Sequence, residues 1–287
     1  MTPAGKPAGI LFLVGTPIGN LEDITFRALR TLKEADLITC EDTRRTQQLL
    51  THYKIKTPTI SYHEHNELTR AAELMIELEQ GSHIALVSDA GMPVISDPGY
   101  RLVSLAIRHG IPVVPIPGAS AFVAALSAAG LPVDKFRFLG FLPSKKAARR
   151  RALEELEGTS KTLVFYEAPH RLLDMLVDLR DLLGDPPVVL AREVTKVHEE
   201  FVRGSASEVL GQVRKKPVKG EITVLVAPQL APRATANGTK SIREAIEHVM
   251  VAEGLNERAA LKVVARQRRL TRSEAYRQLQ AEKTSEE

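Results

Sequence analysis

Acidic and glycine residues gather in one short stretch, Val87–Gly99, which reads VSDAGMPVISDPG. Asp89 and Asp97 are carboxylates that can face a positive charge or accept a proton. Gly91 and Gly99 have no Cβ, so the backbone can approach a ligand closely, and two prolines stiffen the segment. We therefore predict that the stretch is a ligand shelf. Two structural roles compete with this prediction: a plain turn at Asp89, and a helix N-cap at Asp97.

A second group of charged residues follows the apolar run LITC. Glu41, Asp42, Arg44 and Arg45 lie within the motif CEDTRRT. Carboxylates can accept hydrogen bonds from ribose hydroxyls, and guanidinium groups bind phosphates, so the group can bind a nucleotide. The same four residues can equally form salt bridges within the protein.

Two further motifs carry histidine. The motif YHEHNE places His63 and His65 two residues apart, which supplies too few ligands for a metal ion without further donors. The one cysteine, Cys40, excludes an internal disulfide and a cysteine-based zinc site. We predict no metal, and a structural or cleft-lining role for the histidines. The motif YEAPHR places Glu167 and Arg171 at a strand-to-helix junction, where Arg171 can also pair within its own helix.

Short apolar runs alternate with helical patterns before these motifs, which predicts βαβ units and a largely parallel sheet. The expected strands lie in the apolar runs 10–14, 36–40, 83–88 and 111–118. The expected helices are Arg44–Leu50, Glu67–Gln80, which Asn66 can cap, and Tyr100–Arg108. In such sheets, ligands bind beyond the carboxyl ends of the strands. Three loops at such ends are rich in Gly, Pro or Ser: Gly15–Asn20, Ser88–Gly99 and Pro117–Ala121. None contains the Walker or the G-x-G-x-x-G pattern.

The rest of the chain divides into a second α/β part and a helical tail. After a helix of small residues that ends near Gly130, strand patterns mix with amphipathic helices in a way that favours some antiparallel pairing. A segment rich in Pro, Ala and Thr then precedes three short helices. We expect Gly254 to end the first of them, Asn256 to cap the second and Thr271 to cap the third. The predicted organisation is an α/β domain at 9–117, a second α/β domain at 118–228, a linker at 229–240 and a helix-turn-helix-like tail at 241–283.

Basic residues are concentrated although the net charge of the 287-residue chain is only +4. One group follows the motif FLGFLPS and comprises Lys145, Lys146, Arg149, Arg150 and Arg151. Another lies along one side of a predicted tail helix and comprises Arg258, Lys262, Arg266 and Arg269. Both groups can contact phosphates of a nucleic acid, and both can be solvated helix faces.

Seven motifs occur in the same order as in a known enzyme family. They are VGTPIGNLEDIT, CEDTRRT, YHEHNE, VSDAGMPVISDPG, IPGASA, FLGFLP and FYEAPHR. Together they resemble the ribosomal RNA small-subunit methyltransferase I family, in the tetrapyrrole-methylase-like group of S-adenosylmethionine enzymes. The resemblance covers about residues 9–228. It implies two α/β domains with the cofactor in the cleft between them, and methylation of a cytidine ribose 2′-hydroxyl in the decoding centre of 16S ribosomal RNA.

The resemblance also implies roles for individual residues. The implied cofactor contacts are Pro17, Ser88, Asp89, Ala90, Val94, Ile95, Ser120, Ala121 and Glu167. The candidate catalytic carboxylates are Glu41, Asp42 and Asp89. The candidate RNA contacts, which we choose for their positive charge and position, are Arg44, Arg45, Arg171 and the two basic groups above, without Arg151.

The expected partner is 16S ribosomal RNA within the small ribosomal subunit, and the expected assembly is a homodimer. We expect a cytoplasmic protein, because the sequence shows no membrane-spanning run and no signal peptide. Two other functions remain open: a tetrapyrrole C-methyltransferase with the same fold and cofactor, and a non-enzymatic regulator that reads nucleic acid with its tail.

Overall fold

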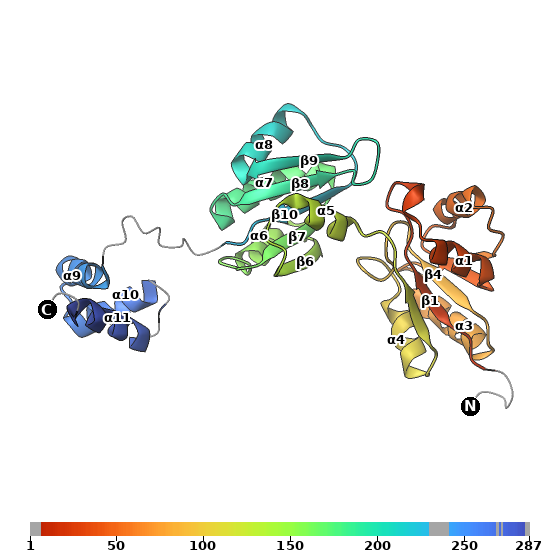
Figure 1. Ribbon diagram of the computed structural model, residues 1–287, viewed down its shortest axis with the longest axis horizontal. Coiled ribbons are helices and arrows are strands. Elements are labelled where there is room, and N and C mark those ends of the chain that lie inside the picture. Colours follow the sequence, from red (N-terminus) through yellow and green to blue (C-terminus); the bar gives the residue numbers. More distant parts are fainter. Residues whose placement is uncertain (1–6, 230–240, 268–269, 271, 285–287) are drawn as a thin grey trace. The chain divides into compact units, whose positions relative to one another are not determined.

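The first β-sheet has five parallel strands in the order β3-β2-β4-β1-β5. Figure 1 labels two of its central strands, β1 and β4. The computed structural model describes residues 7–229, 241–267, 270 and 272–284. The strands are β1 (Leu11–Val14), β2 (Leu37–Cys40), β3 (Thr59–Ser61), β4 (Ile84–Val87) and β5 (Val113–Ile116). Strands β1, β2, β4 and β5 confirm the sequence prediction, whereas the three-residue strand β3 was not predicted.

Helices cover both faces of this sheet. The helices are α1 (Phe26–Glu34), α2 (Thr43–His52), α3 (Glu67–Glu79) and α4 (Tyr100–Arg108), with a short 3-10 turn, η1 (Leu21–Asp23). Alternation along the central strand β4 explains the arrangement. Ile84 and Leu86 pack with α3 and α4, whereas Ala85 and Val87 pack with α1 and α2. Both faces of β4 are buried, as expected for a parallel sheet.

The second sheet is mixed, in the order β6-β7-β10-β8-β9. Its strands are β6 (Phe136–Phe141), β7 (Thr162–Glu167), β8 (Pro187–Arg192), β9 (Glu200–Ser205) and β10 (Ile222–Val226), and only β6 and β7 pair in parallel. One face packs against α6 (Lys146–Glu154), α7 (Pro169–Leu183) and α8 (Ala206–Lys215). The other face packs against α5 (Ala121–Ala129).

The two sheets share part of their apolar packing. Ile18, from the loop after β1, is buried in the same apolar cluster as Ala125 of α5 and Val164 and Leu225 of the second sheet. The described residues 7–229 accordingly form one compact unit. The proposed domain boundary at residues 117 and 118 stays a prediction.

The described tail residues form a second unit, of three helices. They are α9 (Ile242–Glu253), α10 (Glu257–Gln267) and α11 (Arg272–Thr284), which pack through Ile246, Leu261 and Ala275. Gly254 ends α9 in the left-handed conformation, and the Asn256 side chain accepts a hydrogen bond from the Ala259 N–H, as predicted. The predicted cap at Thr271 and most of the predicted linker lie outside the described residues.

Two predicted helix caps are wrong. Helix α4 begins after Gly99, with φ of 139°, and not at Asp97 and Pro98. Asn66 occupies the N-cap position of α3, but its side chain accepts a hydrogen bond from the His63 N–H instead of capping the helix. Asp97 is therefore available for a role other than capping.

Candidate active site

Loops from neighbouring strands meet at the carboxyl edge of the first sheet. Thr16, after β1, pairs with Gly91, after β4, through two backbone hydrogen bonds of 2.9 and 3.1 Å. The Thr16 hydroxyl also donates to the carbonyl oxygen of Ser88 at 3.1 Å, and the Ser88 hydroxyl donates to that of Gly91 at 3.2 Å. These bonds hold the two predicted ligand loops in one fixed arrangement.

The segment after Gly91 has an unusual backbone. Val94 and Ser96 have φ values of 76° and 63°, which is a costly region for residues with a side chain, above all for β-branched Val94. Strain of this kind often occurs at functional sites. The Val94 side chain packs against the core below α3 and α4, whereas Ile95 lines the adjoining cavity. Of the two implied apolar cofactor contacts, Ile95 therefore lines the cavity and Val94 does not, and both contacts stay predictions.

A cavity of about 880 Å³ extends from these loops to the second sheet. We call it the donor cavity. Its lining includes Ala90, Gly91, Asp97, Gly118, Ser120, Ala121, Phe122, Phe141, Tyr166, Glu167 and Glu221. Most of this lining is apolar or backbone, with a few carboxylates, which is the usual character of a cofactor site. The predicted contacts Ala90, Ser120, Ala121 and Glu167 all line this cavity.

One carboxylate oxygen in the donor cavity is buried without a partner. The Glu167 side chain is fully buried, and its Oε1 accepts a hydrogen bond from the Ala168 N–H at 2.8 Å and pairs with Arg171. No hydrogen-bond partner is found for Oε2. A buried acceptor of this kind requires an explanation, and a bound ligand with N–H or O–H donors provides one. The Arg171 guanidinium also donates to the Leu142 and Pro143 carbonyls, so it acts within the fold.

Asp97, which the sequence analysis assigned to a helix cap, faces the donor cavity instead. Burial raises its pKa to about 6, and the negative charges of Glu41 and Asp89 add to this effect. Gly99 is the residue in the sequence that could have indicated this. Glycine readily adopts a positive φ, so α4 begins after Gly99 and not at Asp97. A carboxyl group with this pKa is poised to change its charge when a cation binds nearby.

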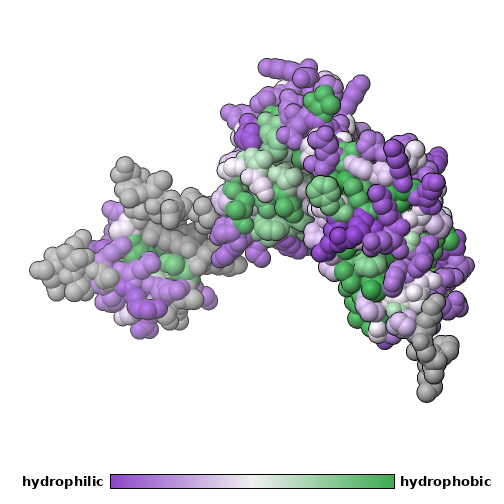
Figure 2. All heavy atoms as spheres, turned by 45° about the vertical axis from the view of Figure 1, so that its right-hand side comes forward, coloured by the Kyte–Doolittle hydropathy of each residue, from purple (hydrophilic) through white to green (hydrophobic). Residues whose placement is uncertain are grey.

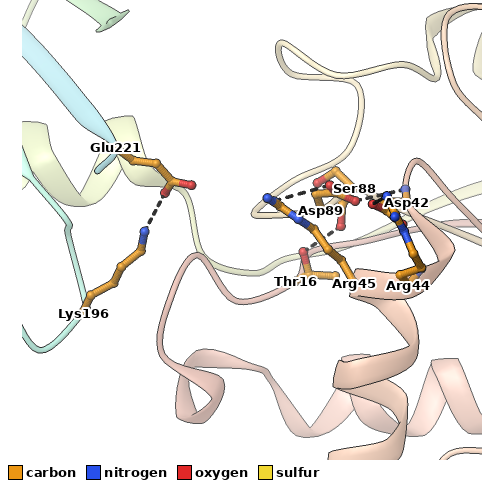
Figure 3. Close-up of polar contacts among 8 residues, drawn as sticks. All are labelled: Thr16, Asp42, Arg44, Arg45, Ser88, Asp89, Lys196 and Glu221. Carbon is orange, nitrogen blue, oxygen red and sulfur yellow. Dashed lines mark hydrogen bonds and ion pairs between the residues drawn. The ribbon is translucent and has the colours of Figure 1, made fainter. Parts of the chain in front are cut away.

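The CEDTRRT residues form an ordered set of ion pairs (Figure 3). Asp42 caps α2, and the Arg44 side chain grips its two carboxylate oxygens at 3.1 and 2.9 Å. These hydrogen bonds lower the pKa of Asp42 to about 2. Asp89 accepts a hydrogen bond from the Asp42 N–H at 3.1 Å and lies 3.5 Å from Arg45. The salt-bridge alternative is therefore confirmed for Asp42, Arg44 and Arg45, whereas nucleotide binding by this group stays a prediction, and the Arg44 side chain remains largely exposed.

Glu41 lies close to these ion pairs, and its pKa is shifted in the opposite direction from that of Asp42. Burial raises its pKa, and the charges of Asp89 and Glu64 raise it further, while His63 and Arg45 oppose the change. The His63 Nδ1 atom is buried without a hydrogen-bond partner. The described residues contain no group of His, Cys, Asp and Glu side chains arranged to hold a metal ion.

A second, polar cavity of about 340 Å³ adjoins the first. We call it the polar cavity. Pro17, Ser88 and Asp89, which were implied as cofactor contacts, line this cavity together with Arg45. Lys196 and Glu221, which the sequence analysis did not single out, complete it from the second sheet's side. The Lys196 ammonium donates to Glu193 at 2.8 Å and to Glu221 at 3.1 Å.

The first basic group divides by exposure. Lys145 and Lys146 are exposed. Arg149 is 2% exposed and forms a 2.8 Å ion pair with Asp178, which is itself 1% exposed, so its assignment as an RNA contact is wrong. Arg150 pairs with the other oxygen of Asp178 at 2.8 Å and is half-buried. Apolar surroundings require this pairing, because an unpaired buried charge is very costly.

In the tail, Arg258 and Lys262 are exposed on α10. The Arg266 side chain and Arg269 lie outside the described residues. Of the four basic side chains in the proposed row, the structure therefore describes only those of Arg258 and Lys262.

Comparisons with known proteins identify relatives. Residues 11–210 match the family model of tetrapyrrole (corrin/porphyrin) methylases. The chain is 50% identical to ribosomal RNA small subunit methyltransferase I of Halalkalibacterium halodurans, over 93% of each chain. It is 52% identical to the protein of the same name of Thermotoga maritima, over 76% of this chain and 98% of that one.

The fold also matches solved structures. One is uroporphyrin-III C-methyltransferase of Thermus thermophilus complexed with S-adenosylhomocysteine, with a TM-score of 0.53 and 20% identity. The match covers 77% of this chain and 99% of that one. At this identity the likeness shows the fold alone, and it agrees with the predicted pair of α/β parts.

Proposed function

This chain belongs to the ribosomal RNA small subunit methyltransferase I family of tetrapyrrole methylases, and we propose that it methylates the ribose 2′-hydroxyl of a cytidine in the decoding centre of 16S ribosomal RNA. Its cofactor is S-adenosylmethionine and its substrate is small-subunit ribosomal RNA. The choice of nucleotide and the use of the assembled subunit are part of the proposal.

The observation that carries the proposal is the donor cavity with its unpartnered, buried Glu167 Oε2. S-adenosylmethionine carries N–H and O–H donors that suit this oxygen, and a positive charge that suits the carboxylate of Asp97. The apolar and aromatic lining, including Phe122 and Tyr166, suits an adenine ring. We propose that Ala90, Ile95, Ser120, Ala121 and Glu167 hold the cofactor in this cavity.

When bound, S-adenosylmethionine supplies a methyl group on a sulfonium, so that the new O–C bond forms as the C–S bond breaks and a neutral thioether leaves. The protein's own residues align the two reactants, and good alignment contributes about 7–11 kcal/mol. They also receive the hydroxyl proton, which typically accelerates such a step by about 10²–10⁴-fold.

Among the candidate proton acceptors, Glu41 is the strongest base, because its pKa is raised above that of an ordinary carboxylate, but it lines neither the donor cavity nor the polar cavity. Asp89 is the only one of the three candidates that lines the polar cavity. Asp42 is a weak base because Arg44 holds its pKa near 2. The backbone N–H of Asp42 and the Arg45 guanidinium engage the carboxylate of Asp89, which favours a positioning role for it.

We propose that the small ribosomal subunit docks through exposed basic side chains of both units. Lys145, Lys146, Arg258 and Lys262 are exposed, as phosphate contacts require. Arg44 and Arg45, which lie at the candidate active site, are the remaining phosphate contacts in this proposal.

A homodimer in the cytoplasm is also proposed. Hydrophobic areas interrupt the hydrophilic surface of the α/β unit (Figure 2). On α3 and α4, the large side chains of Leu68, Ile76, Tyr100 and Ile107 are exposed. Exposed apolar patches often mark protein–protein interfaces. Among the described residues, no helix has the length and apolar composition that a membrane span needs.

The two other functions are less well supported. A tetrapyrrole C-methyltransferase shares the fold, but the relatives named for ribosomal RNA are 50% and 52% identical to this chain. A non-enzymatic regulator could use the donor cavity as a ligand sensor, but the relatives reported above are named as methyltransferases.

The decisive experiment supplies the protein with S-adenosylmethionine labelled on its methyl group. Small ribosomal subunits, naked 16S RNA and uroporphyrinogen are supplied as acceptors in parallel reactions, and 2′-O-methyl marks in the RNA are then mapped. We expect label in one cytidine of the subunit RNA. Label in uroporphyrinogen alone would support the tetrapyrrole reaction, and no transfer to any acceptor would support the regulator.

A further inference from the structure

The polar cavity has a composition that differs from that of the donor cavity. Four charged side chains line it: the cations Arg45 and Lys196 and the carboxylates Asp89 and Glu221. Its volume of about 340 Å³ lies at the lower end of the range for small-ligand pockets. A site with two cations and two carboxylates matches a ligand that has both phosphate acceptors and hydroxyl donors.

The two cations come from different parts of the fold, and both line the polar cavity. In Figure 3 the Arg45 guanidinium lies by Asp89 and the Lys196 ammonium lies by Glu221. Arg45 projects from α2, its side chain is 64% exposed, and its 3.5 Å contact with Asp89 is longer than an ordinary hydrogen bond. Its guanidinium can therefore turn to a phosphate at little cost. Lys196 lies in the segment between β8 and β9, where its ammonium uses two of three N–H donors on Glu193 and Glu221.

Lys196 is held firmly in this position. Burial opposes its charge, but the hydrogen bonds with Glu193 and Glu221 outweigh that effect and raise its pKa. Its aliphatic stem lies against Gly19, where any Cβ would collide with the lysine side chain. Lys196 therefore reaches from the second sheet's side onto the loop that follows β1.

The two cavities adjoin along a shared wall. Ile18, Ala90 and Glu221 line both of them. A methyl donor in one cavity and an acceptor in the other can meet only at this wall, because a displacement requires the reacting atoms to be in contact. The site therefore offers two compartments of different chemistry.

We propose that the polar cavity is the acceptor subsite, where Arg45 and Lys196 bind the phosphates that flank the target ribose, and Asp89 and Glu221 accept hydrogen bonds from its hydroxyl groups. The inference rests on the proposed function, since it presumes an RNA acceptor. It adds Lys196 and Glu221 to the site.

The test uses the variants Arg45→Gln and Lys196→Met. Methionine keeps an apolar stem against Gly19 while it removes the ammonium, so the fold is preserved. Methyl transfer to small ribosomal subunits is measured at several subunit concentrations, and S-adenosylhomocysteine binding is measured separately by calorimetry. We expect each variant to raise the KM for subunits at least tenfold and to change the cofactor Kd less than twofold.

Two controls sharpen the result. Lys33→Met removes an exposed lysine of α1, outside the polar cavity, and should leave both constants unchanged. Lys196→Arg keeps a cation and should recover much of the lost affinity. Wild-type KM in both Arg45→Gln and Lys196→Met, or an equal loss of cofactor binding, would overturn the subsite.

The outcomes separate the two proposals. If the wild-type protein transfers no methyl group to ribosomal RNA, the proposed function fails. If the wild type transfers it and the two variants do so with unchanged KM, only the acceptor subsite fails. A salt titration adds an independent check, because loss of one phosphate contact should reduce the salt dependence of subunit binding by about one unit of slope.

Discussion

The backbones of Gly15 and Gly118 touch each other: a Cβ added to either residue would lie 2.7 Å from the Cα of the other. Gly15 follows β1, Gly118 follows β5, and the Gly15 N–H donates to the Ile116 carbonyl at 3.1 Å. The contact brings together two of the loops that form the donor cavity. It explains why glycine is required at both positions, although neither is forced into the left-handed conformation.

Gly118→Ala should therefore disturb the cofactor site. The new methyl group meets backbone atoms, which cannot rotate away, so the loops must separate, with a loss of about 1–3 kcal/mol in the free energy of unfolding. We expect weaker S-adenosylhomocysteine binding by calorimetry and a lower Tm. Gly211→Ala is the control: its Cβ would meet open space within α8, so it should stabilise the protein by about 0.5–1 kcal/mol. Unchanged cofactor affinity in Gly118→Ala would contradict the close contact.

Arg149→Ala should reduce stability and leave RNA recognition in the folded protein unchanged. Removal of the guanidinium leaves the buried Asp178 with less compensation, and breaking such a pair typically costs about 3–5 kcal/mol. Urea unfolding measures the effect. Arg151→Ala, whose side chain is 82% exposed, should change stability by less than about 0.5 kcal/mol. Normal stability with weakened RNA binding in Arg149→Ala would restore its predicted role.

Asp97 should make cofactor binding depend on pH. Its pKa of about 6 means that the carboxyl is neutral below this pH, and a cationic ligand prefers the charged form. Affinity for S-adenosylmethionine should rise as the pH increases through 6 and level off above 7. In Asp97→Asn the affinity should be lower and should lose this dependence. A wild-type affinity that stays constant between pH 5 and 7 would exclude the role.

The same residue should affect stability with a definite sign. Asp97 has a higher pKa in the folded protein than the ordinary aspartate value of 3.8, so the folded state binds more protons between about 3.8 and 6. Its charging therefore lowers stability as the pH rises through that window. Asp97→Asn should be more stable than the wild type at pH 7.5, by about 1 kcal/mol after allowance for partial exposure, and equally stable below pH 3.8. Thermal melting at both pH values tests this.

The tail should contribute to RNA affinity through charge. Arg258→Ala and Lys262→Ala should each reduce the salt dependence of subunit binding by about one unit of slope. Deletion of residues 238–287 should weaken RNA binding and leave cofactor binding intact. The exposed Lys56 supplies a matched control, Lys56→Ala. Equal RNA affinity of the truncated and full chains would exclude the tail.

Local pattern was enough to predict most elements. Apolar runs followed by glycine or proline identified β1, β4 and β5, and helical spacing identified α4 with its observed bounds, because these signals depend on neighbouring residues alone. The same information failed for β3, which is only three residues long and takes its order from pairing with β2. It also failed for Asp97, which is a good capping residue but lies two residues before Gly99, the residue that occupies the N-cap position of α4.

The sequence by itself determined the fold class, the order of the elements and the family, since periodicity and ordered motifs are properties of a linear chain. Only the tertiary structure decided which charged residues are free to bind. Arg149 and Lys145 belong to the same basic run, yet one is buried against Asp178 and the other is exposed. Lys196 and Arg45 are distant in sequence and line one cavity. Burial and long-range proximity depend on how separate elements pack, and no local pattern contains that information.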